Sequence, residues 1–226
     1  MGSVGATLPG RPYPPPPCRE SRWPAQVVIA IAILLQIFVL PRELVPGPTW
    51  LIPLLEVVLA VALLILAPGH IERHERRHRA LALALVAVVS ASNIISLGAL
   101  TDNLLRHHVN NGPHLIGAGV VIWLTNFLIF AIWYWELDRG GPGRRAEGAD
   151  RRPDFLFPQM ADDRIHPDGW RPHFLDYLYV SLTNATAFSP TDTMPLSHMA
   201  KMVMGVQSLV SLVTLGLIVS RAVNIL

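Results

Sequence analysis

The 226-residue sequence is poor in the features from which soluble enzymes and secreted domains are built. It has one cysteine, Cys18, so a single chain can form neither an internal disulfide nor a thiolate metal site. Charged residues make up only 15% of the chain and hydrophobic residues 51%, a balance typical of a protein that lies in lipid. The sequence also lacks a Gly-rich phosphate loop, an HExxH motif, a CxxC motif and a locally arranged set of Ser, His and Asp. We therefore expect a membrane protein that is not an enzyme and uses no cofactor.

The hydrophobic runs divide the chain into a Pro-rich tail without helical periodicity, a four-helix transmembrane region, a polar basic linker and a C-terminal module. These parts cover residues 1–22, 23–136, 137–172 and 173–226. The second part contains four apolar runs, at 23–40, 50–67, 80–100 and 115–135. Each run is close to the ~20 helical residues that a hydrocarbon core of ~30 Å requires. The tail is expected to be disordered and the linker exposed, with one short amphipathic piece around "DFLFPQM".

The C-terminal module combines a short apolar segment, a hydroxyl-rich stretch and a long apolar run. The segment from His173 to Phe188 is too short to span comfortably and favours a re-entrant half-helix. In the last run, 196–226, four polar residues fall on one helical face: Gln207, Ser211, Thr214 and Arg221. Such a stripe indicates a surface that either faces water or packs against another helix. Since non-helical backbone at membrane depth needs protein or a water-filled cavity around it, this order of segments indicates a lined pathway.

The stretch "SLTNATAFSPTDTMP", Ser181 to Pro195, and the helix after it resemble the pore module of potassium-channel-like ion channels. In that family a pore helix of the type SLTTLT leads into a TVGYGD filter, a proline three residues later and an inner helix. Here "SLTNAT" stands at the end of the pore helix, "AFSPT" stands in place of TVGYG, and Asp192 matches the acidic position. The resemblance covers roughly residues 173–226. It implies an all-α membrane protein with about five transmembrane helices and a re-entrant pore half-helix before the last one.

The filter positions depart from the family in a way that changes the expected selectivity. Ser189 and Thr191 stand where the family has two glycines, whose free dihedral angles aim carbonyl oxygens at the ion. Pro190 replaces the tyrosine and restricts its own φ and the residue before it. The resemblance therefore implies a cation channel that is not strictly potassium-selective, with inorganic cations as partners and assembly as a homo-oligomer, a tetramer in that family. The expected filter residues are Thr183, Thr186, Ala187, Phe188, Ser189, Pro190, Thr191 and Asp192, and the expected pore-lining helix residues are Gln207, Ser211 and Thr214.

The distribution of arginine predicts which end of the molecule lies in the cytoplasm. With a cytoplasmic N-terminus, fourteen arginines fall in the inner segments, and the outer loops hold only Arg42 and Arg106. We therefore expect a plasma-membrane protein with a cytoplasmic N-terminus. The pore loop then enters from the cytoplasm, which is opposite to ordinary potassium channels. The arginine-rich run after residue 70 is expected to contact anionic membrane lipids.

A weaker signal lies in "HIERHERRHR", which places His70, His74 and His78 at steps of four residues. On a helix these side chains share a face, the spacing that a zinc or copper site uses, but the neighbouring arginines repel a cation. Glu56 is the only charge in the second run and lies either within the membrane or at its interface. Two further functions therefore stay open: a metal or proton transporter, and a non-conducting structural or partner-binding protein with a channel-like fold. A nucleic-acid partner is not expected, because acidic residues interrupt the basic linker.

Overall fold

The computed structural model describes residues 20–38, 51–66, 72–106, 112–146, 152–161, 170–186 and 192–225. Nearly all elements in these ranges are helices, which confirms the predicted all-α class. The helices are α1 (Trp23–Phe38), α2 (Leu51–Leu66), α3 (Glu72–Arg106), α4 (Gly112–Leu137), η2 (Asp138–Gly140), α5 (Pro142–Ala146), α6 (Pro158–Ala161), α7 (Phe174–Thr186) and α8 (His198–Ile225). The two strands, β1 (Phe155–Leu156) and β2 (Met194–Pro195), form a small antiparallel pair.

Three helices, α3, α4 and α8, are long and apolar enough to cross a membrane. Their apolar parts are His78–Leu104, His114–Gly140 and His198–Val223. Helices α1 and α2 are also apolar, but each has only 16 residues, or about 24 Å at 1.5 Å per residue. The described chain therefore has the helix lengths of a membrane protein, and the five predicted crossings stay a prediction.

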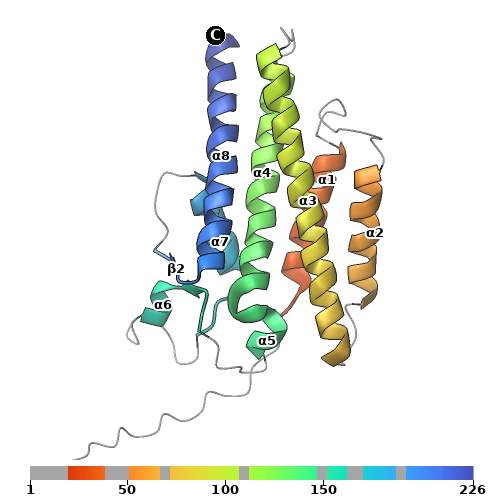
Figure 1. Cartoon of the computed structure of the whole chain (residues 1–226), viewed down its shortest axis with the longest axis vertical. Coiled ribbons are helices and arrows are strands. Elements are labelled where there is room, and N and C mark those ends of the chain that lie inside the picture. The colour runs from red at the N-terminus through yellow and green to blue at the C-terminus, as the bar shows by residue number, and fades with distance from the viewer. Residues whose placement is uncertain are drawn as a thin grey trace, which may run out of the picture.

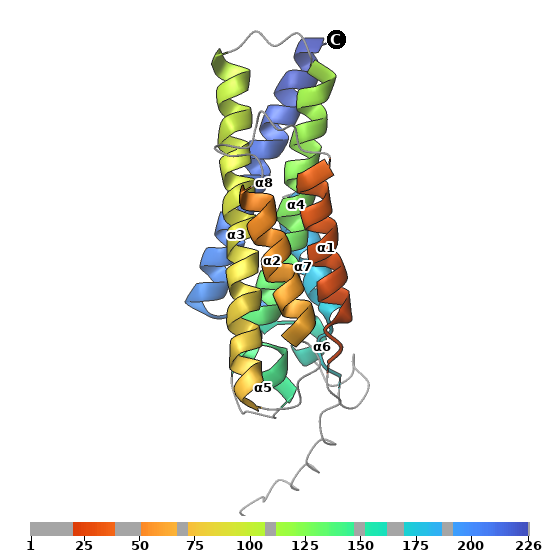
Figure 2. The same cartoon turned by 90° about the vertical axis from the view of Figure 1, so that its right-hand side faces the viewer.

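Helix α4 lies at the centre of the bundle and contacts α1, α3, α7 and α8, while α2 packs on α1 and α3 (Figures 1 and 2). Helices α3 and α8 run in the same direction and α4 runs opposite to them. The start of α3, the end of α4, the start of α8 and the short elements α5, α6 and β2 lie at one end of the molecule. We call this the α5 end. The C-terminus lies at the other end.

Hydrogen bonds at the first turns fix where α7 and α8 begin. The side-chain oxygen Oδ2 of Asp176 accepts a hydrogen bond from the backbone N–H of His173 at 2.6 Å, as the acidic residue of a capping box does. The hydroxyl of Ser197 accepts one from the backbone N–H of Ala200 at 3.1 Å, the usual role of a serine N-cap. The chain therefore has a defined start for each of the two helices of the C-terminal module.

The described parts of segment 137–172 differ from the exposed linker that the sequence predicts. Phe155 and Phe157 are 0% and 3% exposed, and their rings lie 6.3 and 5.4 Å from the ring of Tyr177 in α7. Leu156 pairs with Met194 between the two strands. The predicted amphipathic piece is therefore present, but it closes the α5 end of the bundle because its aromatic side chains bury apolar surface there.

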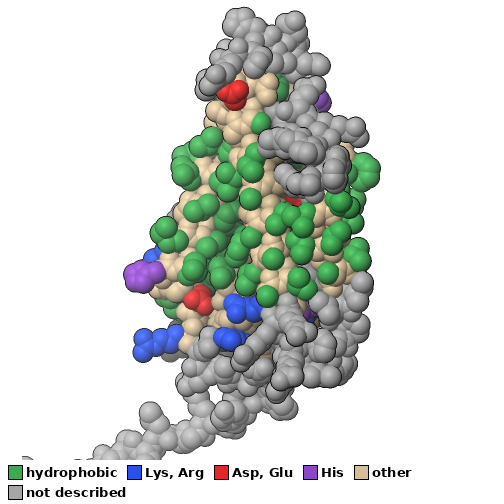
Figure 3. Space-filling model, turned by 45° about the vertical axis from the view of Figure 1, so that its right-hand side comes forward, with side chains coloured by type: hydrophobic (Ala, Val, Ile, Leu, Met, Phe, Trp, Pro, Cys, Tyr) green, Lys and Arg blue, Asp and Glu red, His purple; other side chains and the backbone are tan. Residues whose placement is uncertain are grey.

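On the face shown in Figure 3, apolar side chains cover the middle of the molecule, and lysine and arginine gather toward the α5 end. Much of the exposed apolar surface belongs to α2 and α8, with Leu54, Met202 and Leu209 at 52%, 67% and 63% exposure. An apolar belt with a basic end is the pattern expected for a helix bundle in lipid.

Candidate functional site

The segment predicted to form a pore loop starts and ends at the same end of the molecule. Helix α7 begins with Phe174, whose ring lies edge-on to Trp135 near the end of α4, at 5.8 Å between ring centroids. It ends near the middle of α4, where the indole N–H of Trp123 donates a hydrogen bond to the carbonyl of Ala185 at 3.2 Å. The chain then returns to β2, which pairs with β1 at the α5 end (Figure 1). Helix α7 therefore covers about half the length of α4.

Gln207 of α8 joins α7, α8 and α4 through its side-chain amide. Its nitrogen donates hydrogen bonds to the carbonyl of Ser181 at 2.9 Å and to the hydroxyl of Ser181 at 2.8 Å. Its oxygen accepts hydrogen bonds from the Tyr134 hydroxyl and from the Asn184 amide. Both donor and both acceptor positions of this fully buried amide are therefore used, as a buried polar group requires.

Asn184 is the second centre of this network and ties the last turn of α7 to α8. Its side-chain nitrogen donates to the carbonyl of Met204 at 3.0 Å and to the oxygen of Gln207 at 2.8 Å. Its side-chain oxygen accepts a hydrogen bond from the hydroxyl of Ser208 at 3.0 Å. The position of the end of α7 is therefore set by side chains of α8 rather than by packing alone.

The residues predicted to line a pore on α8 face the interior of the helix bundle. Gln207, Ser211 and Thr214 are all 0% exposed. Asn126 of α4 donates a hydrogen bond to the Ser211 hydroxyl at 2.8 Å, and Thr214 donates to the carbonyl of Val210 in its own helix at 2.7 Å. The sequence left two interpretations of the polar stripe, a water-facing surface or a surface that packs against another helix, and the structure supports packing. The pore-lining assignment of these three residues is corrected accordingly, because α4 and α7 cover this face.

The predicted filter residues are only partly described. Thr183 and Thr186 lie in the last turns of α7, and their hydroxyls donate to the carbonyls of Tyr179 and Thr183 at 2.9 Å each. Asp192 lies just before β2 and is exposed. Ala187, Phe188, Ser189, Pro190 and Thr191 lie outside the described residues. Their role in a filter stays a prediction.

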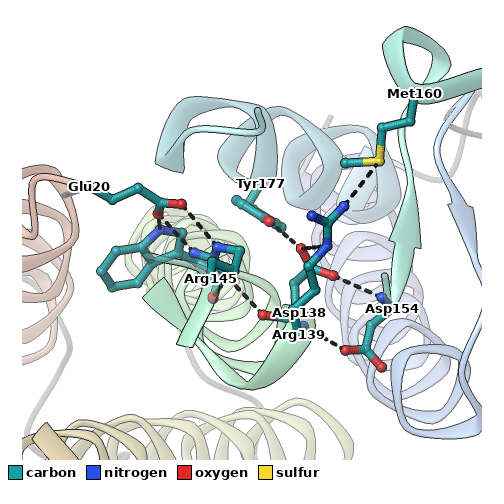
Figure 4. Close-up of polar contacts among 8 residues, drawn as sticks. Glu20, Asp138, Arg139, Arg145, Asp154, Met160 and Tyr177 are labelled. Carbon is teal, nitrogen blue, oxygen red and sulfur yellow. Dashed lines mark hydrogen bonds and ion pairs between the residues drawn. The ribbon is translucent and has the colours of Figure 1, made fainter. Parts of the chain in front are cut away.

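A second polar cluster, at the α5 end, is built around Arg145 (Figure 4). The guanidinium of Arg145 donates to both carboxylate oxygens of Glu20, at 3.0 and 2.9 Å, and to the carbonyls of Trp135 and Asp138, at 2.7 and 2.8 Å. Burial alone lowers the pKa of Arg145, but the hydrogen bond with Glu20 opposes it and the pKa lies above its ordinary value. This bidentate pair therefore fixes the segment before α1 to the end of α4.

Asp138, directly after α4, extends the same cluster to α7 and to the segment before β1 (Figure 4). Its carboxylate accepts hydrogen bonds from the Tyr177 hydroxyl at 2.6 Å and from the backbone N–H of Asp154 at 2.8 Å. Asp138 is 0% exposed. Its two carboxylate oxygens therefore hold the start of α7 and the strand pair in place.

Glu56 of α2 is fully buried, at 0% exposure. Its depth in a membrane, within the hydrocarbon or at the interface, stays a prediction. Neither carboxylate oxygen has a hydrogen-bond partner among the described residues. Burying a carboxylate without a partner costs several kcal/mol by transfer estimates, so Glu56 is a residue that packing alone does not explain.

The structure brings together no predicted metal site within the described residues. Groups of three or more His, Cys, Asp or Glu side chains able to hold a metal ion are absent there. His78 lies in α3 and is 6% exposed. His70 lies outside the described residues, as does the side chain of His74.

Sequence reasoning missed that α7 has a polar face matching the one on α8. Tyr177, Ser181 and Asn184 fall at offsets of 0, 4 and 7 residues, the same spacing as Gln207, Ser211 and Thr214. Two helices with matched polar stripes can pair these stripes in an apolar environment. The spacing on α7 was therefore a signal for the contact of Gln207 with Ser181 and Asn184, whereas Ser211 bonds to Asn126 of α4.

No protein-family model, curated protein or solved structure matches this chain.

Proposed function

We propose that the protein is a subunit of an oligomeric, cation-conducting pore in a membrane. The observation that carries this proposal is the path of α7, which starts beside Trp135, ends beside Trp123 at the middle of α4 and is followed by a return to the starting end. With α4 across a bilayer, α7 reaches only the middle of the membrane. That is the geometry of a re-entrant half-helix, which proteins place where backbone lines a cavity.

The direction of α7 favours cations over anions. The C-terminal end of a helix carries partial negative charge from its unpaired carbonyls, and in α7 this end is the one at mid-depth. The next residues, 187–191, include Ser189 and Thr191, whose hydroxyl oxygens are ligands for cations. Asp192 adds a negative charge before the chain reaches β2. We propose Thr183, Thr186 and 187–192 as the filter region.

The exposed face of α8 supports assembly of several copies. Met202, Leu209 and Leu212 are 67%, 63% and 61% exposed, and a Cβ atom added at Gly205 or Gly216 would meet nothing within 4 Å. One α7 and one α8 enclose no pathway, so we infer that this face of α8 points toward a shared axis. We propose four copies, the number in the channel family that the sequence resembles. The lining is then mostly apolar along α8, because its polar stripe packs inside the subunit.

The arginines favour a cytoplasmic α5 end in the plasma membrane. Arg79, Arg139, Arg144 and Arg145 belong to elements that meet at this end, and Arg152 lies just before β1. Positively charged residues concentrate on the cytoplasmic side of membrane proteins. In this orientation α7 enters from the cytoplasm and the N-terminus is cytoplasmic.

Conductance of the purified protein in a planar bilayer tests the proposal. We expect cation current under sodium and potassium gradients, little current from a chloride gradient, and a smaller single-channel cation conductance in Asp192→Asn. Asp102→Asn is the matched control, since Asp102 is an exposed acid near the end of α3 that lies away from the α5 end. An oligomer that is folded by thermal unfolding yet silent under all gradients would support the non-conducting, partner-binding alternative instead.

A second candidate, proton-coupled transport, is favoured by one observation, the buried carboxylate of Glu56 without a described partner. Glu56→Gln keeps the shape of the side chain and removes its acid. In a pore this change leaves conductance unaltered. In a proton-coupled transporter it abolishes proton flux into vesicles, measured with an internal pH dye. The two functions therefore give opposite results with one variant.

A further inference from the structure

An arginine-lined cavity of about 460 Å³ lies at the α5 end, outside the network that joins α7 to α8. Its lining residues are Arg79, Leu137, Arg139, Gly140, Arg144, Arg152 and Asp154. The four arginines come from α3, η2, α5 and the segment before β1. Among the described lining residues, Asp154 is the one acid that faces them. Positive charges brought together from four segments repel one another, and this repulsion lowers the stability of the fold unless a bound anion neutralises it.

Two of the arginines are only partly neutralised inside the protein. Arg79 donates to the carbonyl of Glu136 at 3.2 Å, but its Nε lies 3.8 Å from the Glu136 carboxylate. Nε of Arg139 lies 4.0 Å from the Asp138 carboxylate. Both Nε atoms are buried without a hydrogen-bond partner among the described residues. One Nη atom of Arg139 donates to the sulfur of Met160 at 3.5 Å. These two guanidinium groups therefore add positive charge to the lining, while their buried Nε atoms are out of reach of a ligand.

The other two arginines are free to turn toward a ligand. Arg152 is exposed and Arg144 half-buried. Within the part of the chain that the structure describes, neither side chain has a hydrogen bond, an ion pair or an electrostatic partner. Arginine presents five N–H donors in a planar fork that matches phosphate oxygens, so two unengaged forks at one cavity favour a phosphate group over a spherical anion.

The backbone that carries Arg139 into the cavity lining is held in an uncommon conformation. Arg139, Gly140 and Gly141 have φ values of 52°, 85° and 97°, and a left-handed conformation costs a non-glycine residue about 1–2 kcal/mol. The backbone N–H of Arg139 donates to the Asp154 carboxylate at 2.8 Å, which helps to hold this loop. Strain of this kind gathers at ligand sites, where surrounding contacts maintain it.

We propose that this cavity binds a phosphate-bearing anion at the cytoplasmic face. The volume lies in the range of small-molecule sites and exceeds what a single phosphate needs, so the rest of a headgroup can enter as well. Two sources share this chemistry, the headgroup of an anionic phospholipid and a soluble phosphate compound. The proposal does not depend on conduction, because none of the lining residues belongs to α7 or α8.

Binding by the full chain in a neutral detergent tests the proposal in two arms. The first arm titrates inorganic pyrophosphate by calorimetry, and the second counts bound phosphatidylglycerol against phosphatidylcholine by native mass spectrometry. The test variant is Arg144→Gln with Arg152→Gln. The control is Arg171→Gln with Lys201→Gln, which removes the same charge from residues outside the lining. We expect at least tenfold weaker binding in the test variant and less than twofold change in the control.

The pattern across the arms identifies the source. If the test variant loses binding of pyrophosphate but not of phosphatidylglycerol, the ligand is a soluble phosphate compound. If it loses binding of phosphatidylglycerol but not of pyrophosphate, the ligand is a lipid headgroup. No binding in either arm, or an equal loss in the control, would overturn the proposal. Arg152→Gln alone, at an exposed position, provides the same comparison with a smaller effect if the double variant does not fold.

Discussion

The side chain of Asn184, in the last turn of α7, donates a hydrogen bond at 2.8 Å to the side-chain oxygen of Gln207 in α8. The Tyr134 hydroxyl of α4 donates to the same oxygen. One amide therefore joins the half-length helix to both of its long neighbours. In an apolar surrounding this network sets the position of α7 more firmly than packing could, since breaking it leaves polar groups without water.

Replacing Gln207 by leucine is expected to destabilise the protein by roughly 2–4 kcal/mol. The change removes four side-chain hydrogen bonds and leaves groups on Ser181, Tyr134 and Asn184 without this partner, and such interhelical bonds contribute up to about 1–2 kcal/mol each. The free energy of unfolding can be followed by tryptophan fluorescence during titration with a denaturing detergent.

Ser220→Leu is the control for this prediction. Ser220 lies on the exposed side of the same helix, so the same kind of change there alters no described packing. A similar loss of stability in both variants would mean that the network of Gln207 contributes nothing beyond hydrophobicity.

Gly119→Ala is expected to destabilise the protein by about 1–3 kcal/mol, the usual cost of overpacking. A Cβ atom at Gly119 of α4 would lie 2.6 Å from Cγ1 of Ile218 in α8, so the two helices must separate or Ile218 must move. Gly117→Ala, two residues earlier, is the matched comparison because its Cβ atom would meet nothing within 4 Å. It should be neutral or stabilising by up to about 1 kcal/mol, since alanine is the better helix former.

Thermal unfolding of Gly119→Ala, Gly117→Ala and Gly119→Ala with Ile218→Ala measures this pair. The second substitution should recover part of the loss by making room. If Gly119→Ala and Gly117→Ala unfold at the same temperature, α4 and α8 do not approach as closely at Gly119 as the structure has them.

The helices could be predicted from the sequence because their signal is local. The first four apolar runs correspond to α1, α2, α3 and α4, and the run at 196–226 corresponds to α8. The apolar run alone predicts a start of the third helix near Ala80, but α3 begins at Glu72. The arginines and glutamates that make up most of residues 72–79 are about as good helix formers as leucine, so the helix extends before the apolar run.

The direction in which side chains point could not be predicted from one helix alone. Gln207, Ser211 and Thr214 form a stripe in any helix, but only contact with α4 and α7 decides that the stripe is buried. Phe155 and Phe157 lie in a polar segment whose composition is typical of an exposed linker, and they are buried because they reach Tyr177 across 20 residues or more. The cluster around Arg145 joins residues 125 positions apart, a distance that no local pattern contains.

Glu20→Ala is expected to destabilise the protein by about 3–5 kcal/mol, because it leaves the buried charge of Arg145 without its carboxylate. The pair Glu20→Ala with Arg145→Met should cost less than Glu20→Ala alone, since no uncompensated charge then remains. The free energy of unfolding of both variants and of Arg145→Met completes a double-mutant cycle. A cycle in which the two costs simply add would show that Glu20 and Arg145 do not stabilise one another.

Cysteine cross-linking tests the orientation of α8 in the assembly. With Cys18→Ser as background, the sequence has no other cysteine, so Leu209→Cys introduces the sole thiol. If the exposed face of α8 points toward a shared axis, copies of residue 209 approach one another and oxidation gives disulfide-linked dimers in membranes. A disulfide needs Cβ atoms about 3.5–4.5 Å apart, which makes the readout specific for close approach.

Val57→Cys provides the comparison, because Val57 is also exposed, at 43%, but lies on α2, on the opposite side of the bundle from α8 (Figure 1). We expect dimers on a denaturing gel for Leu209→Cys and monomers for Val57→Cys. The reverse result would place α2 at the subunit contact and leave the α8 face to lipid. In that arrangement the half-helix α7 could not border a central pathway, because α7 packs beside α8 and not beside α2, and the proposed pore would lose its geometric basis.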